Sequence, residues 1–385
     1  MSGTFEQARD FFQRGLAQYQ AGQYPEADAS LSAALALLPG RPSTLTNLGA
    51  TRLKLGQPAQ ALELLEQALA QEPGNVEALG HCAAALAELG RTEPALACLE
   101  RLLAIDAGVG HAWSVRGSLL RELGRPGDAA ACYREAITRG ADPQLNGYYL
   151  AALGGAVAPS AAPPHYVEQL FDGYAGSFEG HLVAQLNYRG PEVLTGWLQA
   201  RAQRFRRAID LGCGTGLCGP LLQPLAAVVD GVDLSRNMLE RAAQTGAYAQ
   251  LQHQDMAGFL AGTEHSYDLL VAADVFIYLG ALDAVFAGAA RVMPAGGVFC
   301  FSVEDADAAA RAQGSPADAA GASATPGSAA AGYVLQASMR YAHHEGYIRA
   351  LAAQTGFEVA DTVRQPLRED QRRPVPGLFL WLAKL

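Results

Sequence analysis

The chain has 385 residues, half of them hydrophobic, and a formal net charge of −10. This length exceeds the usual size of one domain, so we expect two domains, and the acidic balance disfavours a nucleic-acid surface, which needs clustered positive charge. The six cysteines form no CxxC pair, the first residues lack the pattern of a secretory signal, and Asp274 and Asp283 interrupt the most apolar stretch, so we expect a cytoplasmic protein without a zinc site or a membrane span.

Small residues recur every 34 residues through the first third of the chain. The aligned series are Gly15, Gly49, Ala83 and Gly117; Gly22, Gly56, Gly90 and Gly124; and Ala27, Ala61, Ala95 and Ala129. Such a period is typical of two antiparallel helices per repeat, with glycine at the turn and small residues where the helices cross. Because one helix pair cannot bury its apolar side alone, the sequence predicts a stacked α-solenoid.

This pattern resembles the tetratricopeptide repeat, over roughly residues 8–143 as four units. The resemblance implies a concave groove that binds a peptide or a partner protein, and a purely structural helical spacer is the alternative. We place the repeat domain at residues 1–143. A short capping helix and a Pro/Ala linker are expected at 144–165.

From residue 166 to 385, short apolar runs alternate with helical stretches, which indicates an α/β domain with a mainly parallel sheet. Strands are expected at 208–211, 228–232, just before Asp255, 269–272, 298–301, 358–359 and 378–382, and helices at 167–171, 189–200, 236–245, 282–292 and 344–354. The segment 305–332 is rich in Ala, Gly, Ser, Pro and Asp and lacks periodicity, so it is predicted to be a disordered insertion.

The strongest chemical signal is the segment AIDLGCGTGLCG at 208–219. An apolar strand ends at Asp210, and Gly212, Gly214 and Gly216 follow at alternate positions. Glycine there indicates that a ligand approaches the main chain, where a side chain would collide with it. After the next strand, Asp233 is placed to accept hydrogen bonds from two ribose hydroxyls.

The segment 214–219 also fits the GxGxxG pattern of a nicotinamide dinucleotide site, and this alternative stays open. Asp210 disfavours it, because a carboxylate suits a cationic ammonium or sulfonium ligand and repels a pyrophosphate. Asp255, after the third strand, adds an acceptor on the adenine side. The last segment, 356–385, fits a strand pair, the last strand antiparallel, that closes a methyltransferase sheet.

These residues resemble a class I S-adenosylmethionine-dependent methyltransferase, with a Rossmann-like fold and a seven-stranded sheet. With the repeats in front, the chain resembles a bacterial family of predicted methyltransferases that carry tetratricopeptide repeats, and residues 166–194 are the most family-specific stretch. The resemblance implies S-adenosyl-L-methionine as cofactor. The residues that it implies around the cofactor are Asp210, Gly212, Gly214, Gly216, Asp233, Met238, Asp255, Met256, Tyr174 and Asp274, with Phe171 and Phe178 beside Tyr174 in a lid.

On the acceptor side, the resemblance places Asp274 and Tyr278 near the reactive methyl group. A general base is optional in methyl transfer. The candidate catalytic residues are His343 and Tyr278, with His344 and Glu304 as further proton acceptors and Arg340 and Tyr341 as substrate anchors. A structural role for His343 is the alternative. Neither an Asn/Asp-Pro-Pro-Tyr motif nor a Pro-Cys pair follows the fourth strand, which disfavours DNA methylation.

The sequence thus predicts an enzyme that transfers a methyl group to a small molecule or a protein, with the repeats as a docking module. A non-catalytic adaptor, which binds partners through its repeats and only senses the cofactor, is the second hypothesis. The sequence identifies neither the acceptor nor the ligand of the repeat groove.

Overall fold

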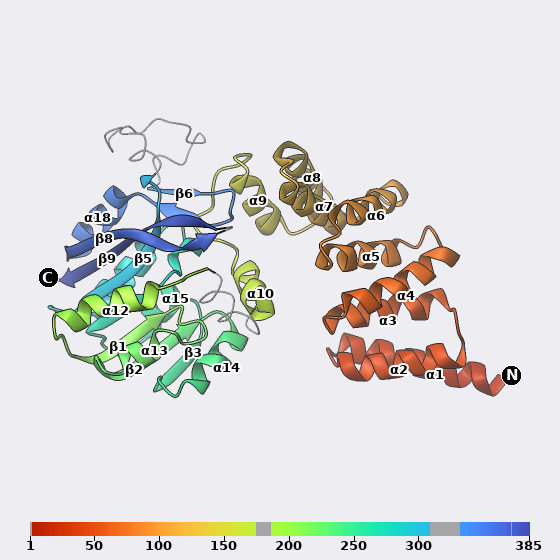
Figure 1. Ribbon diagram of the computed structural model, residues 1–385, viewed down its shortest axis with the longest axis horizontal. Helices are drawn as coiled ribbons and strands as arrows, with labels where there is room; N and C mark the ends of the chain where they lie inside the picture. Colours follow the sequence, from red (N-terminus) through yellow and green to blue (C-terminus); the bar gives the residue numbers. More distant parts are fainter. Residues whose placement is uncertain (1, 175–185, 309–331, 371) are drawn as a thin grey trace. The chain divides into compact units, whose positions relative to one another are not determined.

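The computed structural model describes residues 2–174, 186–308, 332–370 and 372–385. The chain divides into two compact units, Met1–Leu150 and Ala151–Leu385 (Figure 1). The division falls inside the segment for which the sequence predicts a capping helix and a linker. Most of the predicted insertion, residues 309–331, lies outside the described residues, as do Phe178 and the side chain of Tyr174.

The first unit consists of successive helix pairs. Its helices are α1 (Ser2–Gln20), α2 (Tyr24–Leu37), α3 (Pro42–Lys54), α4 (Pro58–Gln71), α5 (Val76–Glu88), α6 (Thr92–Ile105), α7 (Gly110–Glu122) and α8 (Pro126–Thr138). Helix α9 (Pro143–Ala152) follows, and within the unit the Tyr149 ring lies 5.1 Å from the Tyr133 ring of α8. The predicted helical-repeat architecture is confirmed.

The 34-residue series explain how each pair packs. A Cβ added to Gly15 would lie 2.6 Å from the Leu31 side chain, and one added to Gly49 would lie 2.7 Å from that of Leu65. A larger residue would therefore push the two helices of a pair apart. The turn glycines, represented by Gly22 with φ 74°, adopt the left-handed conformation that glycine tolerates best.

The second unit is an α/β domain. Its helices are α10 (Pro164–Tyr174), α12 (Gly190–Ala200), α13 (Gly219–Leu222), α14 (Arg236–Gln244), α15 (Met256–Gly262), η1 (Phe276–Tyr278), α16 (Asp283–Val292) and α18 (Glu345–Gln354). Its strands are β1 (Phe205–Leu211), β2 (Ala226–Asp233), β3 (Gln250–His253), β4 (Leu269–Ala272), β5 (Val298–Asp305), β6 (Tyr333–Leu335), β7 (Tyr341–His343), β8 (Phe357–Asp370) and β9 (Arg373–Lys384).

The sheet contains the predicted strands in the order β3-β2-β1-β4-β5-β9-β8. The five strands from β3 to β5 are parallel. Strand β9 runs antiparallel to β5, as the sequence of residues 356–385 predicts for the last strand. The short hairpin β6–β7 was not predicted. It joins the end of β5, where the Ala306 N–H donates to the His343 carbonyl at 3.1 Å and the His344 N–H donates to the Gly332 carbonyl at 3.0 Å.

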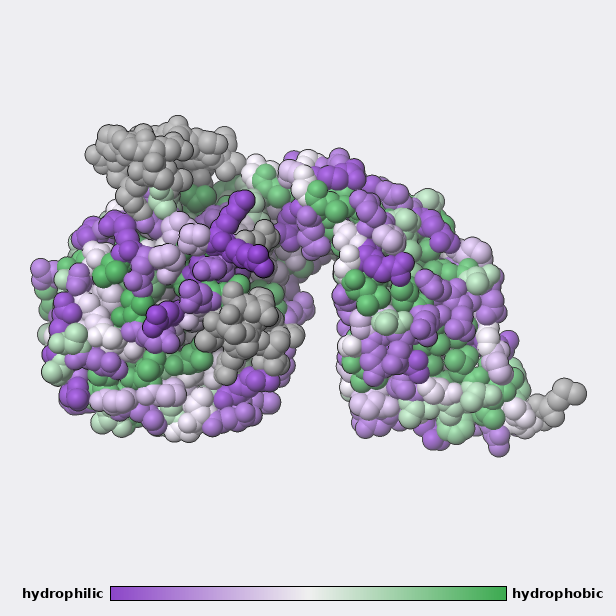
Figure 2. All heavy atoms as spheres, viewed as in Figure 1, coloured by the Kyte–Doolittle hydropathy of each residue, from purple (hydrophilic) through white to green (hydrophobic). Residues whose placement is uncertain are grey.

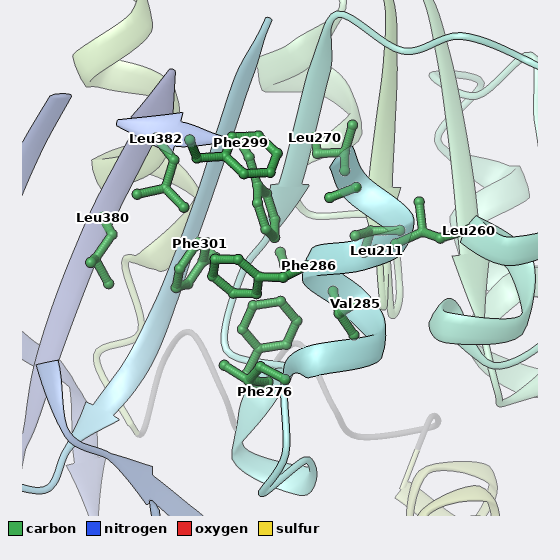
Figure 3. Close-up of a cluster of buried hydrophobic side chains, with 14 of the residues drawn as sticks. Leu211, Leu260, Leu270, Phe276, Val285, Phe286, Phe299, Phe301, Leu380 and Leu382 are labelled. Carbon is green, nitrogen blue, oxygen red and sulfur yellow. The ribbon is translucent and has the colours of Figure 1, made fainter. Parts of the chain in front are cut away.

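Two hydrophobic clusters hold helices against opposite faces of the sheet. One joins α15, α16 and α18 to the sheet, and Figure 3 shows its aromatic centre, where Phe286 of α16 lies 5.5 Å from Phe299 and 5.8 Å from Phe301 between ring centroids. The other joins α12 and α13 to the sheet through residues such as Leu198 and Trp381. Both clusters fix the ends of β1, β2 and β4.

On the face of the molecule drawn in Figure 2, hydrophobic and hydrophilic residues are interspersed over both units. Among the helices of the described residues, none combines the length and the apolar composition that a membrane crossing requires.

Candidate functional site

A cavity of about 770 Å³ lies at the carboxyl ends of β1, β2 and β4. The strand order reverses here, because β2 and β3 lie on one side of β1 whereas β4 and β5 lie on its other side. Such a switch point leaves a crevice in which ligands of α/β proteins bind. The predicted site residues that the structure brings into its wall are Asp210, Gly212, Gly214, Asp233, Met238, Asp255, Met256, Asp274 and Tyr278.

Asp210 is the buried carboxylate at the end of β1. The Tyr248 hydroxyl donates to its Oδ2 atom at 2.7 Å. Burial raises the pKa of Asp210 to about 7, although the Tyr248 bond opposes this rise, and the nearby Asp233 adds to it. The carboxyl therefore changes charge near neutral pH, at a place where a positively charged ligand would favour its ionised form.

The glycine loop that follows β1 makes room for a ligand at one position. Gly214 has φ 53° and lines the cavity, and an added Cβ would meet no atom within 4 Å, so its main chain faces open space. By contrast, a Cβ on Gly212 would collide with the Val275 side chain. Gly216 lies outside the wall, and its own Cβ would lie 3.1 Å from the Ala242 Cα of α14, so this glycine serves the packing of the loop.

Asp233, at the end of β2, is held by main-chain donors. The Gly214 N–H donates to one carboxylate oxygen at 2.8 Å, and the Ser235 N–H donates to the other at 2.9 Å. Burial raises the pKa of Asp233, and these two bonds oppose the rise. Since a carboxylate oxygen accepts more than one hydrogen bond, both oxygens keep capacity for a ligand.

The residues predicted on the adenine side lie around the first turns of two helices. Met238 of α14 is buried, and the Ser235 hydroxyl accepts a bond from its N–H at 3.1 Å, which caps the helix. Asp255 caps α15, because its Oδ1 atom accepts the Gly258 N–H at 2.8 Å. Asp255 is exposed, so the cap is a role that the sequence prediction did not assign to it.

Helix α10 covers part of the cavity. The Ser235 hydroxyl donates to an Asp172 carboxylate oxygen at 2.5 Å, and the Asn237 amide donates to the Asp172 carbonyl at 3.1 Å. The Phe171 ring packs edge-on against the Tyr278 ring, with 5.5 Å between centroids. The structure thus joins α10 to the start of α14 and to η1, while the predicted lid roles of Tyr174 and Phe178 fall outside the described side chains.

At the other end of the cavity lies a buried ionic cluster of Asp274, Arg368 and Glu304. One guanidinium nitrogen of Arg368 lies 2.6 Å from both oxygens of Asp274, and the other donates to Glu304. Asp274 has φ 54°, a conformation that costs a non-glycine residue roughly 1–3 kcal/mol and must be held by its surroundings. The Ser302 hydroxyl helps to hold this conformation, because it accepts a hydrogen bond from the Asp274 N–H at 2.9 Å.

Two tyrosines complete this end of the wall. Tyr278 comes from η1, and burial raises its pKa to about 12, although Arg340 opposes the rise. Tyr188 is only 5% exposed, and its pKa is raised by burial and then by Asp274, with Asp210 also contributing. Tyr188 therefore lies near carboxylates of both ends of the cavity.

His343 is one of the predicted residues that the structure leaves outside the cavity wall, which disfavours its predicted role as a catalytic base. Its side chain is fully buried outside the cavity wall, with Nε2 lying 3.0 Å from the Gly280 carbonyl. Burial lowers its pKa to about 4. His344 bonds to Asp307 at 2.6 Å, and the Tyr341 hydroxyl donates to the Pro159 carbonyl at 2.9 Å, so neither lines the cavity.

Arg368, Tyr188 and Thr215 are among the residues of the wall that sequence reasoning missed. Arg368 has no local signal, because its partner Asp274 lies 94 positions earlier in the chain. Tyr188 lies in the family-specific stretch 166–194, which was the available hint. Thr215 is fully buried, and its hydroxyl has no hydrogen-bond partner among the described residues.

The charges of the wall favour a cationic ligand. Within the described residues the wall contains five aspartates and two arginines, without lysine or glutamate. S-adenosylmethionine carries a positive sulfonium and an ammonium beside its carboxylate, so its net charge complements this excess of acid. The open main chain at Gly214 and the unpaired Thr215 hydroxyl also fit a nucleoside ligand. The described residues contain no cluster of three side chains suited to a metal ion.

Comparison with known families agrees with the two units. Models of the tetratricopeptide repeat match residues 52–119 and 110–139, and a methyltransferase-domain model matches residues 208–297. A curated relative, the biotin biosynthesis bifunctional protein BioHC of Saccharophagus degradans, is 32% identical over 126 residues, which are 31% of this chain. The match spans about a fifth (22%) of the length of that relative.

Solved structures resemble each unit in part. Magnesium protoporphyrin IX methyltransferase from Synechocystis PCC 6803 with bound SAM is 19% identical over 58% of this chain and 97% of that one, with a TM-score of 0.40. The N-methyltransferase NodS of Bradyrhizobium japonicum WM9, in complex with S-adenosylhomocysteine, is 18% identical over 50% and 84%, with a TM-score of 0.36. The tetratricopeptide-repeat protein TTC0263 of Thermus thermophilus is 24% identical over 38% and 80%, with a TM-score of 0.35.

The family models carry the assignment, because each coincides with the unit in which the corresponding architecture is seen. The chain is therefore a protein with tetratricopeptide repeats followed by a methyltransferase domain.

Proposed function

We propose that the protein is an S-adenosylmethionine-dependent methyltransferase that binds its cofactor in the cavity at the ends of β1, β2 and β4. The observation that carries this proposal is the bare main chain at Gly214, which lies in the cavity wall with Asp210 and Asp233 in a domain of the methyltransferase family. A cationic nucleoside ligand requires space against the main chain, an acceptor for its sugar and nearby negative charge, and this wall offers all three.

Different residues of the wall would contact different parts of the cofactor. Asp233 would accept the ribose hydroxyls, Asp210 would face the cationic methionine end, and Met238 would pack on the adenine. Asp255 and the main chain of Met256 would contact the adenine edge. When bound, the cofactor supplies an electrophilic methyl group, so the chain mainly has to align the acceptor and exclude water. Helix α10, which packs on Tyr278, would provide that exclusion.

The repeat unit would dock a protein or peptide. Stacked helix pairs of this kind present an extended concave surface. This docking would bring a partner to the enzyme, either as the methyl acceptor or as the complex in which the enzyme works. A cofactor-sensing adaptor without turnover is the competing function.

The binding proposal is tested by calorimetry with S-adenosylhomocysteine. We expect low-micromolar affinity for the full chain and loss of binding in Asp233→Ala, because the substitution removes the sugar acceptor. Glu358→Ala is the control, since Glu358 is an exposed carboxylate of β8 outside the cavity wall. A chain that ignores this ligand but binds NADH contradicts the proposal and supports the dinucleotide alternative.

Turnover is tested separately. The full chain is incubated with labelled S-adenosylmethionine and a cell lysate, with Asp233→Ala as the inactive control. Transfer of label that depends on Asp233 supports the enzyme. Cofactor binding without any transfer supports the adaptor.

A further inference from the structure

The acceptor end of the cavity combines an apolar wall with polar groups at one point. Val167, Leu170 and Phe171 of α10 line the wall together with Ile277 and Leu279. Asp274, Tyr278 and Tyr188 provide the polar groups. A cavity near the upper part of the ~300–1,000 Å³ range of ligand pockets has room for a second small group beside a nucleoside.

The positive charges at this end are already neutralised. Arg368 faces two carboxylates, those of Asp274 and Glu304, and its side chain is 2% exposed. Arg340 forms an ion pair with Asp370 at 3.2 Å. Among the described residues of the wall, no cation therefore remains free to neutralise an anionic acceptor.

The polar groups at this end suit a ligand with both donor and acceptor capacity. The Tyr188 and Tyr278 side chains line the cavity, and Tyr188 is only 5% exposed. A tyrosine hydroxyl can both donate and accept a hydrogen bond, whereas an ionised carboxylate only accepts. An amine donates to a carboxylate and, when neutral, accepts from a hydroxyl.

On the basis of the proposed function, we infer that the methyl acceptor is an amine nitrogen on an apolar group, which binds at Asp274, Tyr278 and Tyr188. The amine reacts in its neutral form. Its lone pair forms the bond to the methyl carbon while the carbon–sulfur bond breaks and its electron pair stays on sulfur. The nitrogen, now positively charged, releases its proton to water.

The test measures binding of matched probes to the full chain saturated with S-adenosylhomocysteine. The probes are 2-phenylethylamine, 3-phenylpropionate and N-acetyl-lysine-methylamide. At least one amine is expected to bind ten times more tightly than the carboxylate. The two amines distinguish a small molecule from a lysine side chain as the source of the nitrogen. Equal or tighter binding of the carboxylate, or no amine binding to a chain that binds S-adenosylhomocysteine, overturns the inference and leaves the proposed function intact.

Variants separate the amine from an anionic acceptor. Asp274→Asn is expected to weaken amine binding at least tenfold, and Tyr278→Phe to weaken it without a change in charge. Glu358→Ala, at an exposed carboxylate of β8 outside the cavity wall, is expected to leave amine binding unchanged. Retained S-adenosylhomocysteine binding shows that a variant is folded. If Asp274→Asn leaves amine binding unchanged while S-adenosylhomocysteine binding is retained, the inference is wrong.

Discussion

Asp210 shows how far one residue can be predicted. The motif placed it at the end of a buried strand, which the structure shows, because strand and glycine signals are local. Its proton affinity depends on Tyr248, 38 positions later, which no local pattern connects to it. The pKa of Asp210 rises from 3.8 to about 7 on folding, so between these pH values the folded chain binds more protons at Asp210 than the unfolded chain does. The contribution of Asp210 to the free energy of unfolding therefore falls as the pH rises from about 4 to about 7.

The ionisation of Asp210 predicts a pH dependence of ligand binding. Below pH 7 the carboxyl is neutral, so affinity for S-adenosylhomocysteine, with its cationic ammonium group, is expected to rise between pH 6 and about 8. Tyr248→Phe removes a hydrogen bond that lowers the pKa, so the midpoint should move upward by up to about one unit. Calorimetry across this pH range measures the midpoint.

Tyr267→Phe is the matched control, because the Tyr267 hydroxyl bonds to Asp230, which is not in the wall. An unchanged midpoint in Tyr248→Phe contradicts the prediction.

The residues that escaped prediction did so for geometric reasons. Arg340, which the sequence predicts as a substrate anchor, does line the cavity. His343 lies in the following strand, where side chains alternate between faces, and it points instead to the carbonyl of Gly280. Which face a short strand turns inward depends on tertiary packing, so the sequence alone could not exclude the histidine.

At the scale of elements, helices and long strands were predictable because their signals are local. The cap Ser235 precedes α14 and an apolar run forms β4, and both elements begin within a residue of their expected starts. The hairpin β6–β7 was missed, because two strands of three residues each are too short to show periodicity. Pairing with β5 stabilises this hairpin, and such long-range pairing has no signature in composition.

The glycine loop after β1 yields a prediction with a matched control. Gly214 (φ 53°) and Gly246 (φ 65°) share the left-handed conformation, and a Cβ at either meets no atom within 4 Å. Both Gly214→Ala and Gly246→Ala should therefore lower the free energy of unfolding by about 1–2 kcal/mol. Only Gly214→Ala should also weaken S-adenosylhomocysteine binding, by at least tenfold, because its methyl group enters the cavity. Thermal unfolding and calorimetry measure the two effects, and equal affinities for both variants would contradict the assigned role of Gly214.

At the scale of the molecule, the chain has two compact units with different architectures. We expect two transitions in differential scanning calorimetry, because each unit buries its own hydrophobic side chains. S-adenosylhomocysteine at a hundred times its dissociation constant should stabilise the unit that binds it by about 2.7 kcal/mol, a rise of roughly 5–10 °C in one transition. The other transition should not move. A single transition that shifts as a whole would show that the units unfold together.

The junction between β5 and β6 has a consequence for how this chain tolerates change. The Ala306 and Gly332 main chains are both fastened to the residues that end β7, so the two ends of the intervening segment are held in place by the sheet. Because these fastenings are main-chain hydrogen bonds, they do not depend on side-chain chemistry, and a substitution that keeps the backbone conformation of both residues leaves the hairpin in place.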